Sequence, residues 1–208
     1  MNLQKLAAAE AQFLTRYPGG FDDPAMAQVR KRHNIGKIEA YAKDTLVREN
    51  FNRPTLIAEA MQTIVSRSSM VSRFEKPRFR EFIHNLNSQE KQFLADALEA
   101  RLYGRAKQRG FEIMLGMLES YKIAKWPLIS VVPFYHNPSR EAFVKPTTAK
   151  GIIQFLEVED LNYRPTPSWD FYRGYRKLLD EVREQVSPTL GPNYAALSGF
   201  LMSVMSPR

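Results

Sequence analysis

Apolar residues recur along most of this chain at the spacing typical of α-helices. The clearest pattern follows Pro54, where one helical face is formed by Leu56, Ile57, Ala60, Met61, Ile64 and Val65. Weaker patterns predict further helices over residues 3–17, 35–49, 79–86, 88–103, 105–123, 148–156, 168–186 and 193–204. We find no internal repeat and no linker long enough to separate two full domains. We therefore expect a mainly α fold, a single multi-helix domain over residues 1–208. The alternative is an N-terminal helical subdomain, 1–52, beside a main helical domain, 53–208.

Several of these segments begin with residues suited to capping a helix. Asn87 stands three residues before Glu90, which is the spacing of a capping box. Ser168 precedes the long segment that ends near residue 186, and Thr147 or Thr148 precedes the run through residue 156. The triplet Asp22-Asp23-Pro24 also predicts a helix start, because an acid accepts hydrogen bonds from free amides and proline is tolerated in a first turn.

One segment has a different character. Residues 128–132 read Leu-Ile-Ser-Val-Val, a short β-branched run, and Asn137-Pro138-Ser139 is typical of a turn. We therefore expect a small β-hairpin near 128–145, or else an ordered loop. Pro133 argues against a central strand, so any sheet here is predicted to be small.

The composition narrows the class of protein. Hydrophobic residues make up 44% of the 208 residues and charged residues 25%, as in ordinary globular domains. The absence of cysteine excludes disulfides, zinc knuckles, iron–sulfur clusters and thiol catalysis. The first ten residues contain no long apolar run, and charges and prolines interrupt the most apolar stretch, 111–134. We expect a cytoplasmic protein with no membrane partner.

Positive charge is concentrated in one part of the chain. The net charge is +8, and residues 101–150 contain nine Lys and Arg against three Glu. Clustered positive charge attracts polyanions such as nucleic acid. The alternative is that the chain is mildly basic without any such partner.

Searches for common catalytic and cofactor motifs are negative. The sequence contains no phosphate-binding loop of the G-x-x-x-x-G-K-S/T type, no G-x-G-x-x-G, no H-E-x-x-H and no G-x-S-x-G. No lysine follows an acid at a spacing of two. His33, His84 and His136 lie far apart in the sequence, so we predict no metal site and no cofactor.

Residues 145–151, Lys-Pro-Thr-Thr-Ala-Lys-Gly, form the first candidate site. If a helix starts near Thr147 or Thr148, its free amides and dipole lie beside Lys145 and Lys150, an arrangement that suits a phosphate or carboxylate. The alternative is an ordinary helix cap with solvated lysines.

The second candidate is a stripe of Arg101, Arg105 and Arg109, with Lys107 nearby. A spacing of four places the arginines on one side of a helix that continues through Gly104, where they would follow a phosphate backbone. Combined with a hairpin carrying Arg140 near its tip, the order of elements is that of a winged helix-turn-helix. A solvated basic face is the alternative.

Aromatic and basic residues alternate between Tyr163 and Lys177. Such a cluster stacks on bases in single-strand-binding proteins. At helical spacing, however, aromatic residues more often belong to the core, and we favour that interpretation.

The segments Lys125-Trp126-Pro127-Leu128 and Lys145-Pro146-Thr147-Thr148-Ala149-Lys150, with Tyr163 beyond them, carry a resemblance. This part of the chain, about residues 125–205, resembles a group of uncharacterised bacterial proteins of similar size with a KWPL…KPxxxK…Y pattern. The resemblance implies one recurrent unit and brings no activity or ligand with it.

These observations give three functional hypotheses. The preferred one is a module that binds DNA, RNA or another polyanion through Arg101, Arg105, Lys107, Arg109, Arg140, Lys145, Thr147, Thr148 and Lys150. The second is a structural module that binds an acidic protein or a second copy of itself, the latter through the apolar segment Tyr194 to Met205. An enzyme is the weakest hypothesis, because no spacing of residues indicates a reaction.

Overall fold

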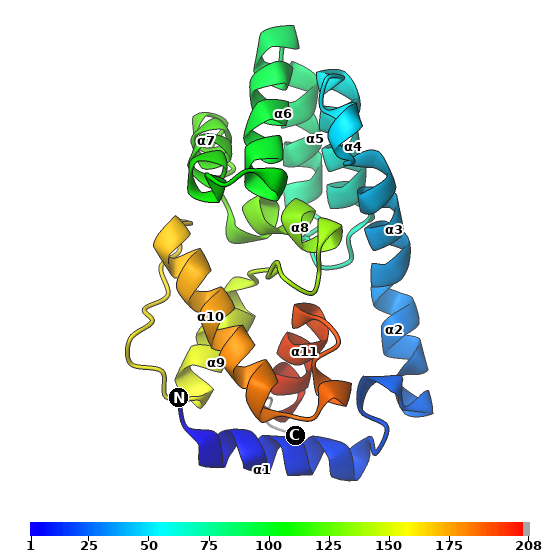
Figure 1. Ribbon diagram of the computed structural model, residues 1–208, viewed down its shortest axis with the longest axis vertical. Coiled ribbons are helices and arrows are strands. Elements are labelled where there is room, and N and C mark those ends of the chain that lie inside the picture. The colour runs from blue at the N-terminus through cyan, green and yellow to red at the C-terminus, as the bar shows by residue number, and fades with distance from the viewer. Residues whose placement is uncertain (206–208) are drawn as a thin grey trace.

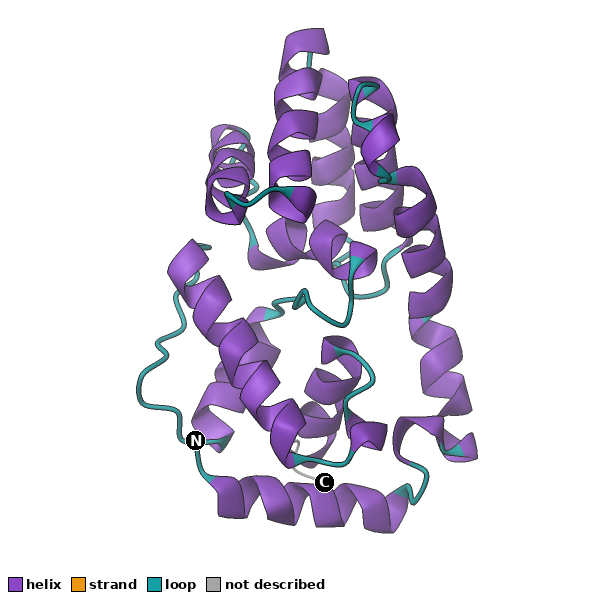
Figure 2. Ribbon diagram, in the orientation of Figure 1, coloured by secondary structure: helices purple, strands orange, loops and turns teal. Residues whose placement is uncertain are grey.

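The computed structural model describes residues 1–205, and within them the chain is helical, with no β-strand (Figures 1 and 2). The α-helices are α1 (Leu3–Arg16), α2 (Ala27–His33), α3 (Ile35–Thr45), α4 (Pro54–Arg67), α5 (Glu75–Asn85), α6 (Ser88–Tyr103), α7 (Lys107–Ser120), α8 (Trp126–His136), α9 (Pro146–Phe155), α10 (Trp169–Gln185) and α11 (Tyr194–Met205). Short 3-10 helices are η1 (Gly20–Asp22), η2 (Pro24–Met26), η3 (Arg48–Asn50) and η4 (Pro188–Leu190). The mainly α prediction is confirmed.

The helices form two groups that are stacked along the long axis of the molecule. Helices α4 to α8 make the upper bundle in Figure 1, and α9, α10 and α11 make the lower group, with α1 lying across its end. Helices α2 and α3 run along one side from the lower group to the bundle. Because α3 packs on α4 and α8 while α1 packs on α11, the first 50 residues contact both groups.

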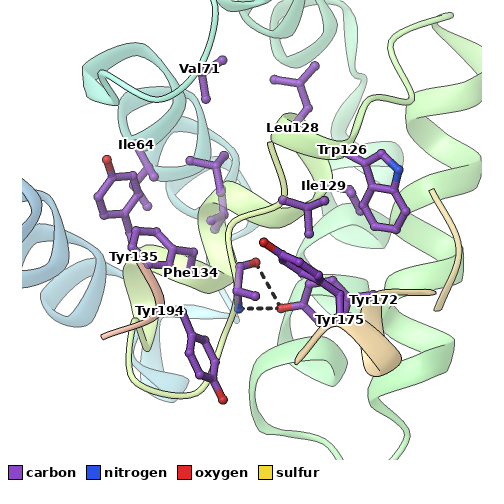
Figure 3. Packing of buried hydrophobic residues seen from close by; sticks show 14 of the residues in the cluster. Ile64, Val71, Trp126, Leu128, Ile129, Phe134, Tyr135, Tyr172, Tyr175 and Tyr194 are labelled. Carbon is purple, nitrogen blue, oxygen red and sulfur yellow. Dashed lines mark hydrogen bonds between the residues drawn. The ribbon is translucent and has the colours of Figure 1, made fainter. Parts of the chain in front are cut away.

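The predicted β-hairpin near 128–145 is wrong. Residues 126–136 form α8, and residues 137–145 are a loop. Ten of the eleven α8 residues, 126–135, are buried. Figure 3 shows Tyr135 beside Ile64 of α4, and Ile129 near Tyr172 and Tyr175 of α10. A helix covered on all sides needs no polar face, so its sequence has no helical period and resembles a buried strand.

The capping predictions are confirmed at the starts of α6, α10 and η2 and are wrong at the start of α9. Asn87 and Glu90 form the predicted capping box, in which Asn87 Oδ1 accepts from the Glu90 amide at 3.0 Å and Glu90 Oε2 accepts from the Asn87 amide at 2.8 Å. Ser168 caps α10, and Asp23 Oδ1 accepts from the Ala25 amide at the start of η2. The predicted cap at Thr147 or Thr148 is wrong, because α9 starts earlier, at Pro146, and has no side-chain cap.

The aromatic residues of α10 belong to the core, as favoured from their spacing. Phe171, Tyr172 and Tyr175 are buried, and the rings of Phe171 and Tyr175 are stacked with centroids 5.9 Å apart. Helix α11 also turns its apolar side inward, and Phe200 meets Phe13 of α1 edge to face at 5.4 Å. This inward side of α11 is therefore covered within the chain and is closed to a second copy.

None of the helices over residues 1–205 combines the length and the apolar character needed to cross a membrane.

Candidate ligand-binding cleft

The start of α9 is a predicted anion motif that the fold places at a cavity. Pro146 opens the helix, since its fixed φ suits a first turn and its missing N–H has no partner to lose there. The amides of Thr147 and Thr148 belong to the same turn, where an α-helix offers no carbonyl partner. Lys145 precedes them and is exposed, and Thr148 is buried with its hydroxyl 3.5 Å from the Met202 sulfur of α11.

A cleft of about 460 Å³ lies beside this helix start, a volume in the range typical of small-molecule sites, about 300–1,000 Å³. Four stretches of chain form it: residues 21–39 with η1, α2 and the start of α3, the turn at 69–70, the loop before α9 with its first turn, and residues 192–202. Its lining residues thus come from α2, α3 and α11 as well as from the start of α9; Figure 1 shows how these helices are arranged.

Apolar side chains make up most of the wall, among them Phe21, Val29, Ile35, Met70, Phe143 and Met202. Two of these, Val29 and Met202, are unusually exposed for large hydrophobic residues, at 41% and 43%. Exposed apolar side chains that gather around a concavity are typical of binding surfaces. The two methionines also give the wall an adaptable shape, because a methionine side chain is unbranched and flexible.

The charged lining of the cleft consists of two basic residues, Arg30 and Lys145, and two acidic residues, Asp22 and Glu39. Glu39 forms an ion pair with Lys43 at 2.6 Å, which leaves Asp22 as the acidic lining residue without an ion pair within residues 1–205. The positive end of the α9 dipole adds positive potential beside Lys145. Arg30 also donates to the carbonyls of residues 21 and 23, which ties the η1 turn to α2.

His33 lines the same cleft. Its Nδ1 lies 3.0 Å from the Ser69 hydroxyl. Burial, followed by the charges of Arg32 and Lys145, lowers the pKa of His33 below its ordinary value. The imidazole is therefore neutral at pH 7 and offers a hydrogen-bonding group rather than a third cation.

A buried polar network fixes the loop that carries Lys145 to the cleft. Arg101 of α6 donates to both carboxylate oxygens of Glu141, at 3.0 and 2.6 Å. The Tyr172 hydroxyl of α10 donates to Glu141 at 2.6 Å and accepts from the Ala142 amide at 3.1 Å, one of the bonds dashed in Figure 3. Further along, the Val144 amide donates to the buried Ser130 hydroxyl of α8 at 3.0 Å. Three helices thus hold residues 141–144.

Within this network, Glu141 is held as a carboxylate although it is buried. Burial by itself raises the pKa of Glu141, but the hydrogen bonds and charge of Arg101 and the hydrogen bond from Tyr172 lower it below the ordinary value. The Arg101 guanidinium also lies over the rings of Trp169 and Tyr172, at 5.2 and 5.0 Å from the ring centroids. The network spans α6, α10 and the loop, so it joins the two groups of helices.

The structure therefore separates the cations that the sequence placed together. Arg101 is 1% exposed, so the prediction that it belongs to an exposed surface is wrong. The stripe with Arg105 and Arg109 is broken as well, because α6 ends at Tyr103 and α7 begins at Lys107. Without a hairpin in residues 1–205, the winged helix-turn-helix arrangement is also absent from this part of the chain.

The remaining predicted residues lie in three places. Lys145 and Thr148 line the cleft. Lys107 Nζ lies 3.8 Å from a carboxylate oxygen of Glu141. Arg140, which precedes Glu141 in the sequence, is exposed. Lys150 leaves the cleft and lies over the Tyr163 ring at 5.1 Å, and Thr147, Arg105 and Arg109 are exposed.

Sequence reasoning missed most of the cleft. Arg30, His33, Met70 and Asn193 line it, yet they come from stretches with no motif of their own. The only local signal was the Lys-Pro-Thr-Thr run, because a helix start can be recognised from a few adjacent residues.

The described residues contain no group of three or more His, Cys, Asp or Glu side chains that could hold a metal ion. Comparisons with protein-family models, with curated proteins and with solved structures find no match.

Proposed function

We propose that this protein binds a small organic anion with an apolar body, and that the cleft between α2, α9 and α11 is the site. One observation carries the proposal: Lys145 and Thr148, at the start of α9, line a cavity whose walls are mostly apolar. Helix starts next to a lysine suit a carboxylate or phosphate. The apolar wall suits the rest of such a molecule.

The charge balance favours an anion over a cation or a neutral ligand. Glu39 is neutralised by Lys43, while Lys145 forms no ion pair with any residue over 1–205. A ligand carboxylate would supply the partner that Lys145 lacks. The network around Glu141 supports this role, since it fixes the loop before α9 and so reduces the ordering cost of binding.

Isothermal titration calorimetry with dodecanoate, dodecyl phosphate and the uncharged dodecanol tests the proposal. We expect both anions to bind, and dodecanol to bind at least about tenfold more weakly, a difference of about 1.4 kcal/mol. Lys145→Glu should weaken dodecanoate binding by a similar factor. Equal binding of dodecanol and dodecanoate would overturn the anionic part of the proposal, and no binding of any of them would overturn the whole.

Lys150→Glu is the matched control. It makes the same change of charge five residues further along the chain, but Lys150 lies over Tyr163 and does not line the cleft. Its affinity for dodecanoate should stay within about twofold of the unmodified chain. If both variants lose affinity equally, the effect comes from net charge and Lys145 is not a ligand-binding residue.

Polyanion binding is the second candidate function. The observation that favours it is that Arg105 and Arg109, both exposed, form no ion pair within the described chain. Fluorescence anisotropy with labelled DNA and RNA at two salt concentrations tests it, with Arg105→Glu/Arg109→Glu as the variant. Affinity should fall steeply with salt and be lost in the variant; indifference to both nucleic acids at low salt would exclude this function.

A further inference from the structure

Helix α2 forms one wall of the cleft but has little anchorage of its own. None of its seven residues, 27–33, is buried. A helix of two turns is marginal in water without tertiary packing. Segments with few buried contacts open at a lower free energy than the core around them.

Short connections flank α2 on both sides. Asn34, which joins α2 to α3, has a left-handed backbone with φ 48° and ψ 35°. On the other side, η2 and the turn at Asp23 lead into η1. Helix α3, by contrast, is fixed to the core through the buried Ile38 and Ala42. The change from an unburied helix to an anchored one therefore falls at a single residue, Asn34.

One side-chain hydrogen bond connects α2 to a distant part of the molecule. It joins His33 Nδ1 to the Ser69 hydroxyl at 3.0 Å. Ser69 belongs to the turn that follows α4 and lines the cleft. The hydrogen bonds of Arg30 are local, to carbonyls of residues 21 and 23. No residue of α2 forms an ion pair within residues 1–205.

We propose that α2 is a gate over the cleft, latched by the hydrogen bond between His33 and Ser69 and closed by bound ligand. The inference rests on the proposed function. Three α2 residues, Val29, Arg30 and His33, line the cavity, so a ligand that contacts them binds the closed state in preference to the open one. A ligand shifts such an equilibrium by its difference in affinity for the two states.

Hydrogen exchange measured by mass spectrometry on the ligand-free protein tests the gate directly. Amides of α2 should exchange at least about 100-fold faster than the buried part of α4. Ser69→Ala should raise exchange in α2 several-fold and leave α4 and α10 unchanged. Ser66→Ala, at an exposed serine in the last turn of α4, is the matched control and should change nothing in α2. Protection of α2 equal to that of α4, or equal effects of the two variants, would overturn the gate.

A second arm adds saturating dodecanoate and separates the gate from the proposed function. Ligand should slow exchange in α2 at least several-fold, and Ser69→Ala should speed dodecanoate dissociation in stopped-flow measurements. If dodecanoate binds but exchange in α2 is unchanged, the gate is wrong and the binding function stands. If dodecanoate does not bind, both the proposed function and the closure of α2 by ligand are wrong. Fast exchange of the α2 amides would not rescue either of them.

Discussion

Arg101 and Glu141, 40 residues apart in the sequence, face each other in a buried bidentate ion pair with hydrogen bonds of 3.0 and 2.6 Å. Their side chains are 2% and 5% exposed. The pair connects α6 in the upper bundle to the loop that leads into α9. It therefore links the stability of the fold to the position of Lys145.

Glu141→Gln should destabilise the protein strongly, because it leaves the Arg101 guanidinium buried without a countercharge. We expect a loss of about 3–5 kcal/mol of unfolding free energy, measured by urea denaturation. The exposed ion pair of Lys43 and Glu39 provides the control: Glu39→Gln should cost less than about 1 kcal/mol. The double variant Arg101→Met/Glu141→Gln should be more stable than the sum of the single changes indicates, by about 0.5–3 kcal/mol. Strict additivity would contradict this account of the pair.

Gly110 allows α7 to approach α6 closely. A Cβ at Gly110 would lie 2.6 Å from the Ala97 carbonyl oxygen and 2.6 Å from the Arg101 backbone nitrogen, so the helices would have to separate. Gly110→Ala should lower the unfolding free energy by about 1–3 kcal/mol. Gly116→Ala, in the same helix with nothing within 4 Å, should instead raise it by about 0.5–1 kcal/mol. Equal effects at the two positions would show that the close packing of α7 on α6 is unimportant.

The stability of the protein should fall as the pH drops from 7.5 to 6. The pKa of His136 is lowered, mainly by burial and also by Lys43 and Lys107, against an opposing effect of Glu141; burial, Arg32 and Lys145 lower that of His33. In the unfolded chain, histidine has a pKa of about 6.5 and takes up its proton first, so acid favours unfolding. Unfolding free energies in urea at several pH values measure this slope.

The variants His33→Asn and His136→Gln should each flatten that pH dependence. A slope of the opposite sign in the unmodified protein would show that the burial of these two imidazoles is not what governs it.

Ser130 should influence both stability and binding. Its hydroxyl donates to the Trp126 carbonyl at 2.7 Å and accepts from the Val144 amide, so Ser130→Ala leaves a buried amide without its partner next to Lys145. We expect a loss of about 1–3 kcal/mol of unfolding free energy and several-fold weaker dodecanoate binding. Val131→Ala, which removes buried volume from the neighbouring position, should cost similar stability and leave the affinity unchanged. If both variants lose affinity for dodecanoate to the same extent, the hydrogen bond of Ser130 to Val144 does not influence binding and Ser130 acts only through packing.

Local patterns predicted most of the helices correctly. The face from Leu56 to Val65 became α4, and the Asn87–Glu90 box starts α6. These features depend on interactions within one or two turns of chain, where a few adjacent residues decide the outcome. Helix α8 was misjudged for the opposite reason. Its apolar run fits a buried strand as well as a buried helix. The packing of this segment against α4, α6 and α10 decides between the two.

The sequence by itself determined that this chain is mainly helical, where α6 and α10 begin, and that the aromatic residues of α10 lie in the core, because periodicity and capping act over a few residues. Only the tertiary structure decided which charges remain available. Arg101 and Lys145 are both basic residues of the same positively charged segment. In the structure Arg101 is buried against Glu141, whereas Lys145 lines the cleft. That cleft is assembled from residues 21–39, 69–70, 143–148 and 192–202. Contacts between such distant stretches depend on how the helices pack, which no local pattern encodes.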